Sequence, residues 1–520
     1  MNKEGKPNIL CFILDQLRFD HLGCAGNGEV STPNIDALAK NGVYFDRAYV
    51  SNPLCMPARA TLFTGLAPKA HGVRTNGIPL SRGIHTLPEA LGRAGYRTHS
   101  IGKLHLRTFG MPDNAPRNEG SAFAYPESYE LWNSGMIKSL PFPYYGLQSA
   151  NFLNGHTSYV YGDYISWLEK ADKEARVKLT PEGATTKPSG APECYKMAIP
   201  EELHYNSWIT ERATDFLRKQ KDSESPFFLW CSFPDPHHPY AAPEPWCDMY
   251  DPANLKMPLA RREGELDDLP PFYRKIYESG GPLVSGLFGP SKTSDAHLRE
   301  MVAQTYGMVS FTDREIGRIM RALRELGMEE ETVVVFLTDH GDMMGDHWMI
   351  KKGPFQFDGC VRMPFIWSWP GRFMRGAVTG GIASQIDFVP TVLDICGVPM
   401  IEGDVPDKPE ADMQPPPLAG RSLVPQLTGK KDRVNEWAII ENDEDYLGLR
   451  VRTFVTENYK MTIYAGEDYG ELYELDSDPK ELNNLWDEAG FARVRERLTA
   501  EFLNAYALQD NPLPRRLTHA

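Results

Sequence analysis

Four predicted strands separated by helical patterns constrain the fold of this chain more than any other feature. The first, Ile9 to Leu14, is a short continuous apolar run, which is typical of a strand buried on both faces of a sheet. Further strands are predicted at Tyr96 to Ile101, Phe227 to Phe233 and Thr332 to Thr338. Their alternation with helices favours an α/β fold with a large mixed, mostly parallel central sheet flanked by helices.

Helix signals lie between these strands. Thr32-Pro33 begins a helix that ends at Gly42, and a second short helix runs from Thr86 to Ala94. A long amphipathic helix precedes the Thr332 strand, with apolar positions that include Met301, Tyr306, Val309, Ile316, Ile319, Met320 and Leu323.

The chain is predicted to divide into a larger part, residues 1–425, and a smaller C-terminal α+β subdomain, residues 426–520. Residues 107–200 are rich in Pro, Gly, Tyr and Asn, and we interpret them as an irregular insertion around a site entrance. The proline-rich and acidic stretch 402–420 is typical of a linker or surface loop. The subdomain is predicted to contain a short antiparallel sheet and two helices. Its predicted strands are Trp437 to Ile440, Leu449 to Val455, Tyr459 to Tyr464 and Glu471 to Leu475, and its helices are Leu482 to Trp486 and Ala492 to Tyr506.

Charge and cysteine usage narrow the class of protein. The chain has 70 acidic and 55 basic residues and a formal charge of −15, which opposes binding to nucleic acid or to anionic membranes. No apolar run approaches the length of a membrane span. The eight cysteines are scattered, with no zinc or redox spacing, and are expected to be mostly buried free thiols. No leader peptide is visible, so we expect a cytoplasmic protein, or a periplasmic or secreted one if a leader has been removed.

Polar side chains follow all four predicted strands, at the point where each strand ends. Because ligands of open α/β sheets bind at the carboxyl ends of the strands, these groups are expected to converge in one crevice. Taken singly, each also fits a turn cap, a solvated loop residue or a buried structural histidine. The groups are Asp15-Gln16, Lys103 with His105, Asp235 with His237 and His238, and Asp339-His340.

The converging groups suit a metal ion and a tetrahedral anion. Asp15, Asp339 and the Gln16 carbonyl are hard oxygen donors of the kind that calcium, magnesium and manganese prefer, while His340 tilts the set toward a transition metal. Cations that would bind an oxyanion are Arg59, Lys103, Lys352 and His237.

Cys55 opens the pentapeptide Cys55-Met56-Pro57-Ala58-Arg59 at the start of a predicted helix. Free cysteine usually packs as a small apolar residue, which is the alternative to a chemical role here. At a helix start, however, its side chain would lie near free backbone N–H groups that attract anions. A metal, an anion pocket and a nucleophile together indicate transfer of a sulfuryl or phosphoryl group.

In these segments the chain resembles the sulfatase family of the alkaline phosphatase superfamily. The matching segments span nearly its whole length and occur in the same order as in the family. The resemblance implies an alkaline-phosphatase-like fold, with a sulfatase-type catalytic domain over 1–425. The matching segments are Pro7 to Gly23, Thr32 to Phe45, Cys55 to Gly65, Gly95 to His105, Asp235 to Pro239, Thr338 to Pro364 and Gly470 to Leu485.

The resemblance implies one divalent metal ion, with calcium preferred and manganese or magnesium as alternatives. Asp15, Gln16, Asp339 and His340 would hold it, with Cys55 as a further ligand after its conversion to formylglycine. Gln16 departs from the two consecutive aspartates of many sulfatases. The pairing of Asp-Gln with Asp-His also occurs in choline-sulfatase-like enzymes and in phosphonate monoester hydrolases, which this chain resembles in this respect.

The remaining implied roles concern the nucleophile and the substrate. Arg59 would stabilise the formylglycine hydrate. Lys103, His237 and Lys352 would bind the sulfate oxygens, one of them serving as acid to the leaving group. His105 would be the base when the covalent sulfate is expelled.

The implied activity is hydrolysis of sulfate monoesters through the formylglycine hydrate, by way of a covalent sulfo-enzyme intermediate. The alternative is a phosphonate monoester or phosphodiester hydrolase with the same nucleophile. A sulfatase-like binding module is disfavoured, because no matched site position is lost. The expected partners are a small-molecule or saccharide sulfate ester and a formylglycine-generating enzyme, and a homo-oligomer is left open.

Overall fold

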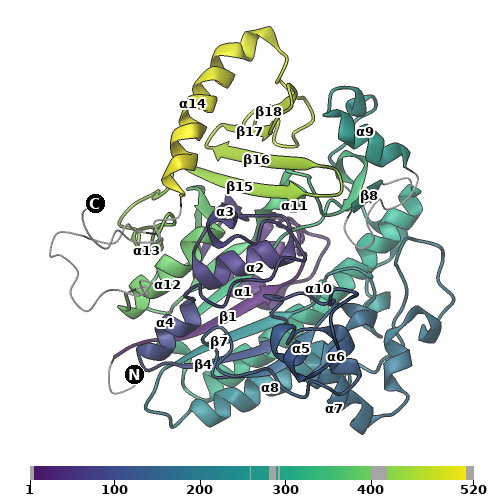
Figure 1. Ribbon diagram of the computed structural model, residues 1–520, viewed down its shortest axis with the longest axis vertical. Coiled ribbons are helices and arrows are strands. Elements are labelled where there is room, and N and C mark those ends of the chain that lie inside the picture. Colours follow the sequence, from purple (N-terminus) through teal and green to yellow (C-terminus); the bar gives the residue numbers. More distant parts are fainter. Residues whose placement is uncertain (1–4, 258, 280–287, 291–292, 400–417, 511–520) are drawn as a thin grey trace.

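A nine-stranded mixed sheet forms the centre of the computed structural model (Figure 1), which describes residues 5–257, 259–279, 288–290, 293–399 and 418–510. Most of the predicted linker at 402–420 therefore lies outside the described residues. The strand order is β13-β2-β12-β9-β1-β7-β4-β5-β6. The strands are β1 (Asn8–Leu14), β2 (Val43–Phe45), β4 (Arg97–Gly102), β5 (Ser149–Asn154), β6 (Tyr161–Gly162), β7 (Phe227–Phe233), β9 (Thr332–Thr338), β12 (Phe365–Ser368) and β13 (Ala377–Thr379).

All four strands predicted from sequence lie side by side in the middle of this sheet and run parallel. β1 pairs with β9 on one side and with β7 on the other, and β4 pairs with β7. β12 and β6 join antiparallel, so the sheet is mixed but mostly parallel, as predicted. The carboxyl ends of β1, β4, β7 and β9 consequently meet at one edge.

Helices cover both faces of the sheet, because alternate residues of the fully buried β1 feed two apolar cores. Leu10, Phe12 and Leu14 pack in the core that contains α1 (Pro33–Lys40), α8 (Tyr205–Gln220) and α10 (Asp295–Glu325). Ile9, Cys11 and Ile13 pack in the core that contains the other helix layer. That layer comprises α2 (Cys55–Thr64), α4 (Leu87–Arg93) and α12 (Phe388–Cys396).

The predicted insertion at 107–200 is less irregular than expected. It contains α5 (Glu119–Ala124), α6 (Tyr129–Asn133) and α7 (Asp163–Ala171), and its strands β5 and β6 extend the main sheet. The first half of β5 is only half-buried, with Ser149 paired to His99 near the sheet margin. A half-buried strand of this kind carries no continuous apolar run, which explains why the pattern did not reveal it.

The C-terminal region contains the predicted antiparallel sheet, in sequential order (Figure 1). Its strands are β15 (Trp437–Glu444), β16 (Leu449–Thr456), β17 (Tyr459–Tyr464) and β18 (Gly470–Glu474), followed by α14 (Ala492–Leu508). The helix predicted at Leu482 to Trp486 is wrong. Asn484 accepts hydrogen bonds from the backbone N–H groups of Leu472 and Trp486, and this side chain fixes a loop against β18 instead.

The C-terminal sheet shares the main core. Ile440 and Val451 belong to the same apolar cluster as β1, whereas Ile439 and Phe454 on the other face pack with Phe502 of α14. The division at residue 425 stays a prediction, because apolar contacts are continuous across it.

The remaining elements are short. They are β3 (Ala48–Tyr49), β8 (Phe288–Pro290), β10 (Met349–Lys351), β11 (Arg362–Met363) and β14 (Ala383–Ser384), with α3 (Pro68–His71), α9 (Pro271–Glu278), α11 (Asp358–Val361) and α13 (Val424–Leu427). Seven of the eight cysteines are buried and all are free thiols, as expected. None of the described helices combines the length and the hydrophobicity that a bilayer span requires.

A buried ion cluster joins the C-terminal sheet to the rest of the protein. The Lys460 ammonium on β17 pairs with Asp358 of α11 and with Glu481, whose Oε1 lies 2.5 Å away. Burial raises the pKa of Glu481 to about 7 even though Lys460 lowers it. Both carboxyl groups therefore depend on Lys460 for their charge.

We expect Lys460→Met to lower the free energy of unfolding by about 3 kcal/mol at pH 8, because it strands two buried carboxylates. Denaturant unfolding measures the loss, and Lys431→Met, which removes an exposed lysine, is the control. A Lys460→Met loss no larger than that of the control would contradict this role.

Candidate active site

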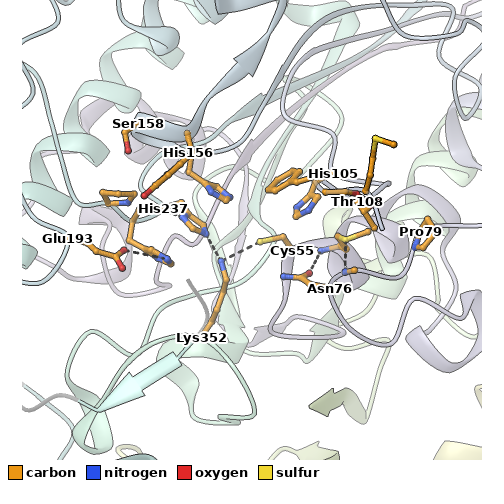
Figure 2. Close-up of a pocket in the computed structure, with 18 of the residues that line it drawn as sticks. Cys55, Asn76, Pro79, His105, Thr108, His156, Ser158, Glu193, His237 and Lys352 are labelled. Atoms are coloured by element: carbon orange, nitrogen blue, oxygen red, sulfur yellow. Dashed lines mark hydrogen bonds and ion pairs between the residues drawn. The ribbon is translucent and has the colours of Figure 1, made fainter. Parts of the chain in front are cut away.

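The side chains predicted to follow the four strands do meet, beside a cavity of about 890 Å³, and Figure 2 shows His105 and His237 among the residues that line it. Asp15 follows β1, Lys103 and His105 follow β4, His237 follows β7, and Asp339 and His340 follow β9. All are at least 95% buried, so their charges act through protein rather than through bulk water. Cys55, His105, His237 and Lys352 line the cavity directly.

Cys55 is the first residue of α2, as predicted, and its sulfur lies at the centre of the site. Sγ lies 3.1 Å from His340 Nε2, 3.4 Å from Lys352 Nζ and 3.8 Å from Asp15 Oδ1. Burial and Asp15 raise the pKa of the thiol, but Lys352, Lys103 and His340 outweigh them and hold it below its ordinary value. Residue 55 thus lies where an oxygen or sulfur anion is stabilised.

Asp15, Cys55, Asp339 and His340 form a cluster whose donor atoms all lie within 4.8 Å of one another. His340 donates from Nδ1 to the Gly341 carbonyl at 2.9 Å, which leaves the Nε2 lone pair directed at the cluster. Two carboxylates and an imidazole nitrogen fit a divalent cation. These residues are therefore the ones that would hold the metal.

A second group of donor atoms also lies within 4.8 Å of one another, and it comprises Asp15, Cys55, His156 and His237. Its two imidazoles are already engaged, because His156 Nε2 contacts Lys103 Nζ at 2.6 Å and His237 Nε2 contacts Lys352 Nζ at 2.5 Å. Ammonium groups donate these hydrogen bonds, so the ring nitrogens act as acceptors rather than as metal ligands. The cluster that contains Asp339 and His340 fits a cation better.

Arg59 lies one turn below residue 55 on α2 and is completely buried. Its Nε donates to Asp339 Oδ2 at 2.8 Å, and its Nη2 lies 3.4 Å from Asp15 Oδ2. Its Nη1 donates to the Lys103 carbonyl at 3.1 Å. Arg59 therefore connects the helix that carries residue 55 to the ends of β1, β4 and β9.

Asp15 is ionised although it is buried. Burial raises the pKa of its carboxyl, but Lys103, Arg59 and Lys352 together hold it well below its ordinary value. The Lys103 ammonium pairs directly with Oδ2 of this carboxylate. A negative ligand is thereby maintained inside the protein.

Gln16 lies beside the metal cluster in a strained backbone conformation, with φ at 64°. Its Oε1 accepts from Lys352 Nζ at 2.7 Å, and its Nε2 donates to Asp342 Oδ2 at 2.5 Å. Asp342 thus fixes the amide so that its oxygen faces Lys352 and the site. An amide adds an oxygen donor without adding a negative charge.

Two of the histidines that line the cavity, His237 and His105, are neutral. Burial lowers the pKa of His237 well below its ordinary value, and the Lys352 charge lowers it further. Burial and Lys103 do the same for His105, whose ring stacks on Phe109 and whose buried Nδ1 has no hydrogen-bond partner among the described residues. A neutral His105 at the cavity wall is able to accept a proton.

Sequence reasoning missed His156 and gave no individual role to His238 and Asp342, and the structure places all three in the site. His156 stacks on His237 with ring centroids 3.5 Å apart, His238 contacts the Gln16 amide, and Asp342 orients that amide. His238 and Asp342 belong to matched segments that were quoted without a role. His156 follows β5, the half-buried strand that carried no apolar pattern, so no sequence signal pointed to it.

Comparison with known proteins decides the family. A model of the sulfatase family matches residues 7–398, and a model of the N-sulphoglucosamine sulphohydrolase C-terminal region matches residues 345–507. The chain belongs to the sulfatase family. Its fold is that of the alkaline phosphatase superfamily. Together with the sulfatase relatives described next, the family shows that the chain is a sulfuric ester hydrolase.

Two curated relatives and one solved structure cover nearly the whole chain. An arylsulfatase of Clostridium perfringens is 28% identical over 92% of this chain and 90% of its own length. A choline-sulfatase of Rhizobium meliloti is 27% identical over 92% of this chain and 82% of its own length. The crystal structure of a phosphonate monoester hydrolase of Agrobacterium radiobacter superimposes with a TM-score of 0.79 at 28% identity, over 97% of this chain and 96% of that one.

Asp339→Asn should weaken binding of a divalent ion roughly 100-fold, because one of two charged oxygen ligands is neutralised. Titration calorimetry with calcium and with manganese measures this directly, independently of activity. Asp172→Asn changes the net charge equally at a surface carboxylate paired with Lys178 and is the control. Unchanged metal affinity in Asp339→Asn would show that the cluster is not the metal site.

Proposed function

We propose that this protein hydrolyses sulfate monoesters with formylglycine at position 55 as the source of the nucleophile. The observation that carries the proposal is the position of residue 55. It lies at the start of α2, within 3.8 Å of the Asp15 carboxylate, the His340 imidazole and the Lys352 ammonium. Such surroundings suit an oxygen nucleophile and an anionic substrate together.

A maturation enzyme that supplies the oxidant would oxidise the Cys55 side chain from CH2SH to CHO, with cleavage of the C–S bond and release of the sulfur as sulfide. The aldehyde then adds water to form a geminal diol. One diol oxygen attacks sulfur while the bond to the alcohol oxygen breaks, and the alcohol leaves with a proton. Loss of the second hydroxyl proton then expels sulfate and restores the aldehyde. A serine at this position would lack that second hydroxyl, and water would have to attack a charged sulfate ester.

The residues of the site divide the work by their contacts. Lys103 and Lys352 place positive charge where sulfate oxygens would lie, and Arg59 fixes the helix start beneath the nucleophile. Lys352, which already donates to His237 Nε2 at 2.5 Å, supplies the proton for the leaving alcohol through that pair. His105 accepts the proton when sulfate is expelled.

Asp15, Gln16, Asp339 and His340 would hold one divalent ion, which would lower the pKa of the nucleophilic hydroxyl and polarise the substrate. We favour calcium because oxygen donors dominate this set, with manganese or magnesium as alternatives. Small-molecule and saccharide sulfate esters both fit the proposal. One relative is an N-acetylglucosamine-6-O-sulfatase of Bacteroides thetaiotaomicron, 23% identical over 95% of this chain.

A phosphonate monoester or phosphodiester hydrolase is the second candidate. It is favoured by Gln16, which leaves one negative charge fewer near the substrate than a second aspartate would. It is also favoured by the similarity to the Agrobacterium phosphonate monoester hydrolase. The same cations and the same nucleophile would serve phosphorus.

The two candidates are separated by kcat/KM on 4-nitrophenyl sulfate and on 4-nitrophenyl phenylphosphonate, measured with protein matured by a formylglycine-generating enzyme. We expect the sulfate to be the better substrate by tenfold or more, a difference of about 1.4 kcal/mol in transition-state binding. Cys55→Ala should lose both activities and is the control for contaminating hydrolases. A tenfold preference for the phosphonate would replace the first candidate by the second.

A further inference from the structure

The cavity carries unequal charge at its two ends. Among the described residues that line it, Lys352 is the only lysine or arginine, and it belongs to the catalytic end. The rest of the wall is mostly apolar or aromatic and includes Phe109, Met111, Tyr159 and Tyr195. Among the described lining residues, a second sulfate or carboxylate on the substrate would therefore meet no lysine or arginine beyond the reacting group.

Glu193 is the only carboxylate among those lining residues, and it stands beyond the catalytic groups. Figure 2 shows it on the opposite side of the Lys352–His237 pair from Cys55. Contacts between neighbouring side chains lead from Cys55 to Glu193. Lys352 Nζ contacts both Cys55 Sγ and His237, the ring of His237 stacks on that of His238 at 4.1 Å, and His238 Nε2 lies 3.9 Å from Glu193 Oε2.

The Glu193 carboxylate is held in place rather than free to swing away. Its Oε1 accepts from Lys351 Nζ at 2.6 Å, and its backbone carbonyl accepts from the Tyr240 N–H at 2.7 Å. The Glu193 side chain is 40% exposed, whereas that of Lys351 is only 4% exposed. A molecule in the cavity therefore meets the carboxylate before the ammonium that lies behind it.

In-line attack places the leaving group on the far side of sulfur from residue 55. Because Lys352 and His237 lie between Cys55 and Glu193, a leaving alcohol opposite residue 55 would extend past this pair toward Glu193. A negative charge on that alcohol would approach a fixed carboxylate in a partly buried site, where repulsion is only partly screened.

We propose that Glu193 is a specificity-determining residue that rejects leaving groups with a second negative charge. The preferred substrates are then monosulfate esters of uncharged, largely apolar alcohols, rather than polysulfated or carboxylated ones. This inference rests on the proposed function. A purely structural role for Glu193, as the partner of Lys351, would affect all substrates alike.

The test uses two phenyl sulfates that differ only in a meta substituent, a carboxylate in one and its primary amide in the other. In the matured wild-type enzyme, kcat/KM should be lower for the carboxylate. Glu193→Gln should raise the carboxylate-to-amide ratio about fivefold, as expected for one partly screened charge several ångström away. The ratio cancels differences in folding and in the extent of maturation.

Glu182→Gln is the matched control, because it removes an exposed carboxylate from the same insertion without altering the cavity lining. It should leave the ratio unchanged. An unchanged ratio in Glu193→Gln, or a wild-type preference for the carboxylate substrate, would overturn the inference.

A binding measurement separates this inference from the proposed function. The dissociation constants of the corresponding unreactive pair, meta-carboxylate and meta-amide phenylmethanesulfonate, report charge selection without turnover. If neither phenyl sulfate is hydrolysed but Glu193→Gln still shifts the binding ratio about fivefold, the sulfatase proposal fails and the role of Glu193 stands. If both sulfates are hydrolysed and neither ratio shifts, only the role of Glu193 fails.

Discussion

The ion pairs of the buried Arg59 with Asp339 and Asp15 hold the active site together. Arg59 belongs to α2, whereas the two carboxylates follow the central strands β9 and β1, so the pairs fix the helix start relative to the sheet. Residue 55 is one turn away on the same helix, so the same ion pairs also fix its position relative to the sheet. Breaking such buried pairs on one side is costly, because an uncompensated charge is left in the interior.

The same charges prepare the site for an anion inside an acidic protein. Lys103, Arg59 and Lys352 surround Asp15 and outweigh burial in lowering the pKa of its carboxyl. Lys352, Lys103 and His340 likewise hold the pKa of the Cys55 thiol below its ordinary value. Burial keeps His105, His156 and His237 neutral, so lysine side chains carry the positive charge beside the cavity. The chain as a whole has a net charge of −15, so this group of cations is a local region of positive charge in an acidic protein.

Much of this arrangement could be predicted from sequence, because strand ends in a parallel sheet converge. The apolar run of β1, and the polar residues after β1, β4, β7 and β9, locate Asp15, Lys103, His237 and Asp339 without coordinates. The position of Cys55 at a helix start was also predictable, because the residues that follow it form a local helix pattern.

The unpredicted parts depend on contacts that leave no pattern in the chain. β5 is half-buried at the sheet margin, so neither it nor His156 beyond it was visible. The loop at 482–486 follows from one side chain, Asn484, that accepts two backbone hydrogen bonds. In the sequence nothing distinguishes Glu193 from an ordinary surface carboxylate. Only the fold places it across the cavity from residue 55.

The central claim is that residue 55 works as an aldehyde hydrate rather than as a thiol. Mass spectrometry of the peptide that contains residue 55, from protein coexpressed with a formylglycine-generating enzyme, tests it most directly. We expect CHO to replace CH2SH at this residue, and sulfatase activity to rise in proportion to the converted fraction. An unconverted cysteine in a protein of full activity would contradict it.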